Sequence, residues 1–283
     1  MQLSFVVPTP IEYFTTLVQG GAAALPLLET AASIAQDEYP ELDVQGVLSE
    51  VDELLARLRR RIPRDAAPLQ TLRILNQYFF RDLSFAGNVN HYEEPDNSYI
   101  HRVLQRRRGI PITLAVLWIE LAQGVGLKAR GVGFPGHFVV KVKLPKGQVI
   151  IDPFTGQSLG RAELSEMLEP FRPGIRPGGD EPPLGLYLQA ATPREIISRM
   201  LRNLKHIHRA QADWGRMIAV QNRLITLLPD AWGEYRDRGL AHAEQGRPAK
   251  AVVDLETYLI HTEDTQDVDA IADRVAELRR DRR

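Results

Sequence analysis

Apolar residues recur at helical spacing between positions 10 and 80 of the chain. Between 44 and 61, valine and leucine fall on one face with charged residues between them, which predicts an amphipathic helix. The stretches 22–37 and 68–80 predict further helices in the same way. Residues 81–98 are polar with little periodicity, so we expect a long loop there, and long loops inside compact domains are often functional.

The pattern changes twice after this loop. A short helix is expected over 99–108, and the nearly all-apolar segment 111–124 predicts a buried helix that begins at a proline. The period then shifts to two, which predicts strands over 128–132, 137–144 and 148–152. A helix followed by a run of antiparallel strands is typical of an α+β domain.

A segment rich in proline and glycine follows, and we place a linker at 176–193 between a first domain over 1–175 and a second over 194–283. The second domain repeats itself with an offset of 34 residues. Tyr235, Gly239 and Ala251 fit a tetratricopeptide repeat. We therefore expect two such repeats and a cap helix over 267–280, with helical hairpins of another kind as the alternative.

Two repeats and a cap helix fall short of the roughly three units that usually bury a stable core. We therefore expect the first domain to supply the missing surface.

Composition narrows the class of protein. The 283 residues are 44% hydrophobic and 25% charged, with a net charge of −1, so no global attraction to nucleic acid or membranes is expected. There is no cysteine, which excludes disulfides, thiolate metal sites and thiol catalysis. The first residues lack the features of a signal peptide, and no apolar run is long enough to span a bilayer, so a cytoplasmic location is expected.

Several motifs between 85 and 154 occur in a fixed order. They are Phe85-Ala-Gly-Asn88, Tyr92, Asn97-Ser98, Val103-Leu104, Arg107-Arg-Gly-Ile-Pro-Ile-Thr-Leu114, Gly133-Phe-Pro-Gly-His-Phe138 and Ile151-Asp-Pro-Phe154. Together they resemble the bacterial SirB family, in which a transglutaminase-like domain precedes tetratricopeptide repeats. The resemblance implies an α+β fold: a helical N-terminal region, a transglutaminase-like (papain-like) core with a small antiparallel sheet, and an all-α tetratricopeptide-like module.

The same resemblance implies roles for individual residues. His137 and Asp152 align with the catalytic base and the acid that orients it. In transglutaminase-like enzymes the thiol follows a glycine by two positions at the start of a buried helix, and counting from Gly109 that position is Pro111. Proline offers neither a side-chain nucleophile nor an N–H group. The His137–Asp152 pair is therefore either vestigial or a general base without a thiol.

Other candidates have more ordinary explanations beside the functional one. Asn97 and Ser98 either cap the following helix or line a pocket, and Gly109 and Thr113 are further candidates for lining that pocket. Thr113, the hydroxyl nearest to the empty nucleophile position, either bonds back to a helix carbonyl or acts as the nucleophile. The basic run 101–108 forms salt bridges or binds phosphate or acidic peptide, and it is the expected source of a partner for Glu120. No residues have metal-ligand spacing on a defined element, so neither a metal nor a cofactor is expected.

The predicted function is that of a non-enzymatic interaction protein, a transglutaminase-like pseudoenzyme whose repeats bind a protein or peptide. The alternative is an amide or ester hydrolase that uses His137 and Asp152 as a general base. Neither a nucleic acid nor a membrane is expected as partner, and the sequence leaves the oligomeric state open.

Overall fold

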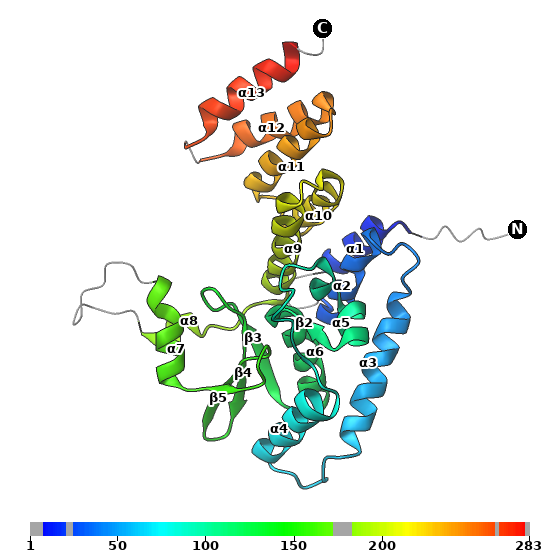
Figure 1. The fold of residues 1–283 in the computed structure, drawn as a ribbon, viewed down its shortest axis with the longest axis vertical. Coiled ribbons are helices and arrows are strands. Elements are labelled where there is room, and N and C mark those ends of the chain that lie inside the picture. Colours follow the sequence, from blue (N-terminus) through cyan, green and yellow to red (C-terminus); the bar gives the residue numbers. More distant parts are fainter. Residues whose placement is uncertain (1–7, 21–24, 172–182, 264–265, 281–283) are drawn as a thin grey trace, which may run out of the picture. The chain divides into compact units, whose positions relative to one another are not determined.

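A computed structural model describes residues 8–20, 25–171, 183–263 and 266–280 (Figure 1). The chain forms two compact units. The sheet unit comprises the described parts of 26–35 and 41–196, and the helical unit those of 1–25, 36–40 and 197–283. The chain thus enters the helical unit three times, whereas the division expected from sequence was linear.

The expected linker at 176–193 falls only in part within the described residues. Residues 176–182 lie outside them. Residues 183–193 contain the short helix α8 and the first residue of α9.

The sheet unit contains one buried helix, α6 (Pro111–Gly124), and several helices that cover it or the sheet. The others are α2 (Leu27–Ser33), α3 (Val44–Arg59), α4 (Pro68–Asn76), α5 (Ile100–Arg106), α7 (Arg161–Leu168) and α8 (Leu184–Tyr187). Helix α6 has the bounds that its apolar run predicts, and α2, α3, α4 and α5 all contact it. Inside this layer the Trp118 indole N–H donates to Oδ1 of Asn76 at 3.1 Å, so a polar atom in the apolar core is satisfied.

The sheet is an antiparallel meander of β3 (Lys128–Val132), β4 (Val139–Leu144), β5 (Gly147–Ile151) and β6 (Ser158–Leu159). Val132 pairs with Val139 on one face of the sheet, whereas Val140, which points to the opposite face, pairs with Ile151, so both faces of the sheet carry apolar residues. A separate parallel pair joins β1 (Ala86–Gly87) to β2 (Arg108–Gly109). The sequence pattern predicted β3, β4 and β5 and missed β1, β2 and β6.

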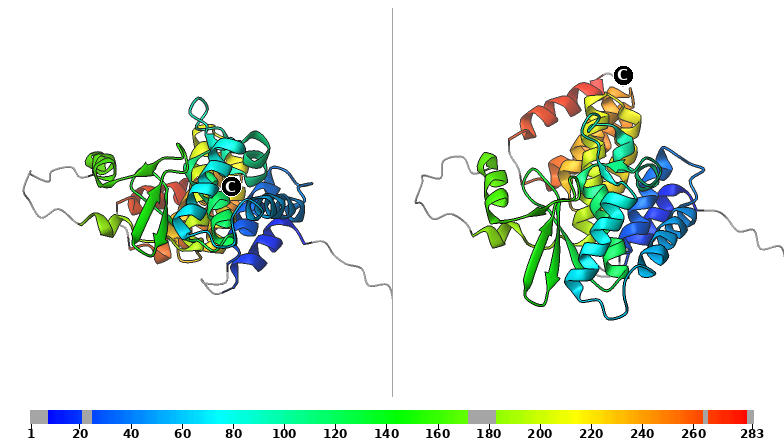
Figure 2. Two further views of the ribbon diagram at one scale, coloured as in Figure 1. Left: turned by 90° about the horizontal axis from the view of Figure 1, so that it is seen from below. Right: turned by 60° about the horizontal axis from the view of Figure 1, so that its bottom comes forward.

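The sheet lies between two layers of helices. Helix α6 contacts β3 and β4, while α7 and α8 lie on the other side of the strands (Figures 1 and 2). The core on that side is apolar and consists of Val132, Phe134, Val139, Ile150, Leu164, Leu168 and Leu188. Burial of both faces fixes the strands, and therefore the loops at their ends.

The helical unit contains the expected helical hairpins. Its helices are α1 (Pro10–Val18), α9 (Pro193–Ala210, from Ile197 on), α10 (Trp214–Leu227), α11 (Trp232–Glu244), α12 (Pro248–His261) and α13 (Val268–Arg280). A methyl group at Gly239 of α11 would lie 2.8 Å from the Leu255 side chain of α12, so the small residue permits close packing of the two helices. Ile271, Val275 and Leu278 of α13 are buried in one cluster with residues of α12, so α13 packs against α12.

The helical unit also includes a helix from the N-terminal part of the chain. Helix α1 packs against α10, and its Phe14 is completely buried. Thr9 and Glu12 cap its first turn reciprocally. Residues outside 194–283 therefore cover part of the repeat module, as the shortage of repeats suggested. Across the described residues, no helix has both the length and the apolar character needed to cross a bilayer.

Candidate functional site

His137 and Asp152 form a hydrogen-bonded pair next to neighbouring strands of the sheet. Nε2 of His137 lies 2.8 Å from Oδ1 of Asp152, and both side chains are largely buried. His137 precedes β4 and follows a turn in which Gly136 has a φ of +66°, a conformation that favours glycine. Asp152 directly follows β5, which pairs with β4 and so brings the two residues together.

A local turn holds the Asp152 carboxylate. Its Oδ1 accepts from the Phe154 backbone N–H at 2.8 Å, and its Oδ2 accepts from the Thr155 hydroxyl at 2.9 Å. Burial raises the pKa of Asp152, but the bonds from His137, Phe154 and Thr155 outweigh it and lower the pKa overall. Thr155 was not among the site residues predicted from the sequence, although an aspartate and a threonine three residues apart at an Asp-Pro turn are a signal for such a structure.

An ionised Asp152 determines how the imidazole is used. Because a carboxylate only accepts hydrogen bonds, Nε2 of His137 is the donor in this pair. In the neutral ring the lone pair then resides on Nδ1. This is the arrangement of a general base oriented by an acid, and it is equally that of a structural polar pair.

The first turn of α6 contains a proline and a buried hydroxyl. Pro111 is its first residue, and Thr113 in the first turn is completely buried. Within the described parts of the chain, the Thr113 hydroxyl has no hydrogen-bond partner, so it is not bonded to His137. Gly109 precedes the helix, and a methyl group added to its Cα would lie 2.9 Å from the Val103 side chain. Close packing therefore explains this glycine without a catalytic role.

Backbone contacts connect the His–Asp turn with the start of α6. The N–H of Gly87 donates to the Phe154 carbonyl at 2.9 Å, and Gly87 pairs with Gly109 in the parallel ladder. The Phe154 ring covers Gly87, where a methyl group would lie 2.3 Å from the ring. The motifs that the sequence presents separately thus come together through Gly87, Gly109 and Phe154.

Asn97 and Ser98 are buried but do not cap the next helix. Asn97 donates to the carbonyls of His91 and Tyr92 at 2.6 and 3.2 Å, and it accepts from the Asn88 amide at 3.0 Å. Helix α5 follows Tyr99, and the described structure shows no side-chain cap there. The capping interpretation is therefore wrong: Asn97 closes the loop 88–97 onto itself. Ser98 has a buried hydroxyl without a partner among the described residues.

The basic run 101–108 forms ion pairs with acidic residues. Arg102 and Arg106 both reach Asp96, at 2.9 and 2.6 Å, and Arg107 lies 3.6 Å from Glu50. This confirms the salt-bridge interpretation. The expectation that an arginine of this run pairs with Glu120 is wrong, because Glu120 is influenced mainly by its own burial and then by Asp52, and both effects raise its pKa.

The sheet unit also has a pocket that lies apart from the His–Asp pair. This pocket, of about 430 Å³, lies over β5, β6 and α7, and its lining includes neither His137 nor Asp152. In the part of the chain that the structure describes, no three histidine, aspartate or glutamate side chains gather to hold a metal ion.

Comparison with known proteins places this architecture among bacterial relatives. Residues 45–202 match the model of the transglutaminase-like superfamily, and residues 204–276 match that of a tetratricopeptide repeat. A UPF0162 protein of Xylella fastidiosa strain Temecula1 is 36% identical over 259 residues, which cover 91% of this chain and 92% of that protein. A UPF0162 protein of Pseudomonas aeruginosa is 29% identical and covers 89% of this chain and 90% of its own length.

A crystal structure of menin is also similar. It has a TM-score of 0.42 at 10% identity and covers 90% of this chain and 71% of its own.

Proposed function

The chain belongs to the UPF0162 family, with a transglutaminase-like domain and tetratricopeptide repeats, and on that premise we propose that it is a non-enzymatic protein-interaction protein. Its sheet unit is a transglutaminase-like scaffold without the nucleophile, and its helical unit binds a protein or peptide partner. The proposal retains the SirB-type assignment, because the motifs that carry it come together around Gly87, Gly109 and Phe154.

The absence of cysteine from the chain carries the proposal. The family resemblance, counted from Gly109, assigns the position of the nucleophilic thiol to Pro111, the first residue of α6, and no cysteine is available to replace it. Thr113, the neighbouring hydroxyl, is buried and makes no hydrogen bond to His137 within the described structure. An oriented base without a nucleophile favours retention of the pair as a structural element.

The repeat module provides the binding part of the proposal. Tetratricopeptide repeats generally mediate protein–protein interactions, and stacked helical hairpins form extended surfaces that suit peptides or helices. A net charge of −1 argues against nucleic acid or a membrane as the partner. We place this interaction in the cytoplasm.

Partner capture with the full chain tests the proposal. The immobilised protein is exposed to bacterial extract, captured proteins are identified, and the affinity of each purified candidate is then measured. We expect a direct complex that the H137Q variant still forms with unchanged affinity. The proposal fails if purified candidates do not bind, or if binding requires an intact His137.

A hydrolase is the second candidate, and the 2.8 Å contact between His137 and an ionised Asp152 favours it. In that case Nδ1 of His137 takes a proton from water as its oxygen attacks the carbonyl carbon of an amide or ester. The bond from that carbon to the amine nitrogen or alkoxide oxygen then breaks, and the leaving group takes the proton back from His137. Hydrolysis of p-nitrophenyl esters and peptide anilides by the wild type and H137Q decides between the two functions. Turnover that H137Q abolishes, with an unchanged melting temperature, would establish the hydrolase.

A further inference from the structure

A pocket of about 570 Å³ opens in the helical unit between α10, α11 and α12. We call it the α11 pocket and define it by Asn222, Arg238, His242, Arg247, Lys250 and Val253. Its lining comes from consecutive helices of the repeat module. The pocket is a site of its own, separate from the His–Asp pair, because every lining residue belongs to the helical unit.

One cation of the α11 pocket is already neutralised. Arg238 forms a two-bond pair with Asp254, with N–O distances of 2.7 and 2.6 Å, and donates to Oδ1 of Asn222 at 2.9 Å. Because the oxygen of the Asn222 amide accepts from Arg238, the amide nitrogen is oriented as a further donor. Arg238 and Asp254 thus shape the pocket without adding net charge.

Two other cations leave the pocket positive. Arg247 and Lys250 are exposed, and neither forms an ion pair with a carboxylate within residues 8–20, 25–171, 183–263 and 266–280. Both lie close enough to His242 to lower its pKa. With the Arg238–Asp254 pair neutral, the lining carries two net positive charges and an amide donor.

His242 adds a buried polar group. The residue is 6% exposed, and its Nδ1 has no hydrogen-bond partner among the residues that the structure describes. Burial lowers its pKa most, Asp254 opposes this effect, and the surrounding cations lower the pKa further. The neutral ring therefore adds polar recognition rather than charge at neutral pH.

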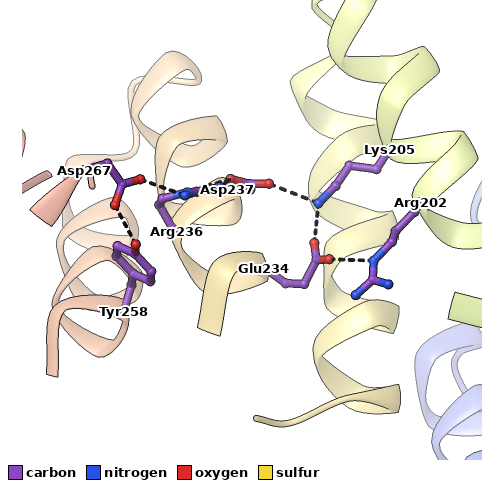
Figure 3. Close-up of polar contacts among 7 residues, drawn as sticks. All are labelled: Arg202, Lys205, Glu234, Arg236, Asp237, Tyr258 and Asp267. Atoms are coloured by element: carbon purple, nitrogen blue, oxygen red, sulfur yellow. Dashed lines mark hydrogen bonds and ion pairs between the residues drawn. The ribbon is translucent and has the colours of Figure 1, made fainter. Parts of the chain in front are cut away.

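Elsewhere on α11 the charges neutralise one another. Glu234 accepts from Arg202 and Lys205 of α9, and Lys205 also reaches Asp237 at 3.0 Å (Figure 3). Arg236 then connects Asp237 to Asp267, as the dashed lines in Figure 3 show. The charged side chains of this series already pair with one another. A charged ligand would therefore gain less electrostatic binding energy there than at the α11 pocket.

Apolar side chains stand beside the cations. Val253 is 63% exposed although it is a large aliphatic residue, and Ile218 also contributes to the pocket wall. A ligand that matches both properties carries a negative group next to an aliphatic group. Among partners of a repeat protein, an acidic peptide segment with a neighbouring leucine, isoleucine or valine has this chemistry.

We propose that the α11 pocket binds an acidic segment of a partner protein, with a carboxylate at Arg247 and Lys250 and an adjacent aliphatic side chain against Val253. This inference rests on the proposed interaction function and names the chemistry of the partner.

Selection from a library of short randomised peptides displayed on phage tests the proposal with the full chain. We expect the bound pool to be enriched in aspartate or glutamate next to an aliphatic residue. A labelled peptide from this pool should bind the R247A/K250A variant about tenfold more weakly than the wild type. The same peptide with asparagine or glutamine in place of its aspartate or glutamate should bind both the wild type and the variant weakly. The control variant R209A/R280A removes the same charge from exposed positions outside the pocket and should keep wild-type affinity.

The outcomes distinguish a failure of this inference from a failure of the proposed interaction function. If the selected peptides lack acidic residues, or if R247A/K250A binds them normally, the inference is overturned while a peptide-binding function remains. If no peptide is selected at all, the inference is overturned, and capture of a protein partner by the full chain still decides the interaction function. Inorganic phosphate forms a second arm: binding of phosphate that depends on Arg247 and Lys250, without binding of acidic peptides, would identify an anion site and overturn the peptide assignment.

Discussion

Arg223 and Asp37 are 186 positions apart in the sequence and form a two-bond ion pair, with N–O distances of 2.6 and 3.0 Å. Arg223 on α10 is completely buried, and its guanidinium also lies 4.9 Å from the centre of the Phe14 ring of α1. This contact joins three separate parts of the chain within the helical unit. It explains how residues outside the repeats complete their core.

We predict that D37N destabilises the full chain by about 3 kcal/mol, because it leaves a buried guanidinium without its counter-charge. E38Q is the matched control. Glu38 pairs with Arg216, whose side chain is 51% exposed, so its loss should cost less than about 1 kcal/mol. Urea unfolding measures both values, and equal effects of the two variants would contradict a special role for Arg223.

A related prediction concerns the repeats in isolation. Residues 194–283 lack α1 and Asp37, so they should melt with low cooperativity or aggregate when expressed alone. Circular dichroism against temperature provides the measurement. A cooperative, monomeric transition in that fragment would show that the contacts of Phe14 and Asp37 are dispensable.

Asp152 should contribute stability that depends on pH. D152A removes an acceptor of three hydrogen bonds, and we expect a loss of about 2–4 kcal/mol at pH 7. Its folded pKa lies below the unfolded value of about 3.9, so the contribution is complete above that value and disappears as the pH falls through the folded pKa. Melting curves of wild type and D152A should therefore converge in acid.

T155V serves as the control for D152A, since it removes one of these bonds and should cost about 1 kcal/mol. A difference between wild type and D152A that stays constant down to low pH would argue that packing, rather than the carboxylate, accounts for the effect.

The sequence predicted the elements that carry a strong pattern. Helix α6 and strand β3 have the bounds expected, because an apolar run between proline and glycine signals defines α6, and alternation defines β3. The pairing of His137 with Asp152 was implied by the resemblance to the SirB family. Strands β1, β2 and β6 were missed, since two residues show no periodicity and are held only by their neighbours.

Contacts that depend on the folded chain could not be predicted in this way. The side chain of Asn97 binds carbonyls at 91 and 92 rather than a helix end, and the path of the loop 88–97 determines that choice. Nor does any local signal relate Asp37 to Arg223. For the same reason, the sequence did not indicate that the described parts of 1–25 and 36–40 belong to the helical unit.

Glu120 gives a prediction of opposite sign to that for Asp152. Burial, and then the nearby Asp52, raise its pKa, so its ionised form costs stability at neutral pH. E120Q should stabilise the chain at pH 7, and the gain should vanish as the pH falls below the unfolded value of about 4.3. Thermal melts from pH 4 to pH 8 measure this, and a destabilised E120Q variant would reveal a polar partner for the carboxylate.

Two glycines of α11 should respond in opposite ways to the same substitution. G239A places a methyl group 2.8 Å from Leu255 and 3.1 Å from the Ala251 carbonyl, so α11 and α12 must separate, at a cost of about 1–3 kcal/mol. G233A meets no atom of the described structure within 4 Å, and alanine favours the helix, so it should be neutral or stabilising by up to about 1 kcal/mol. Urea unfolding gives the energies, and hydrogen exchange should become faster in α11 and α12 of G239A alone. Equal stability of the two variants would contradict the close packing that defines this repeat.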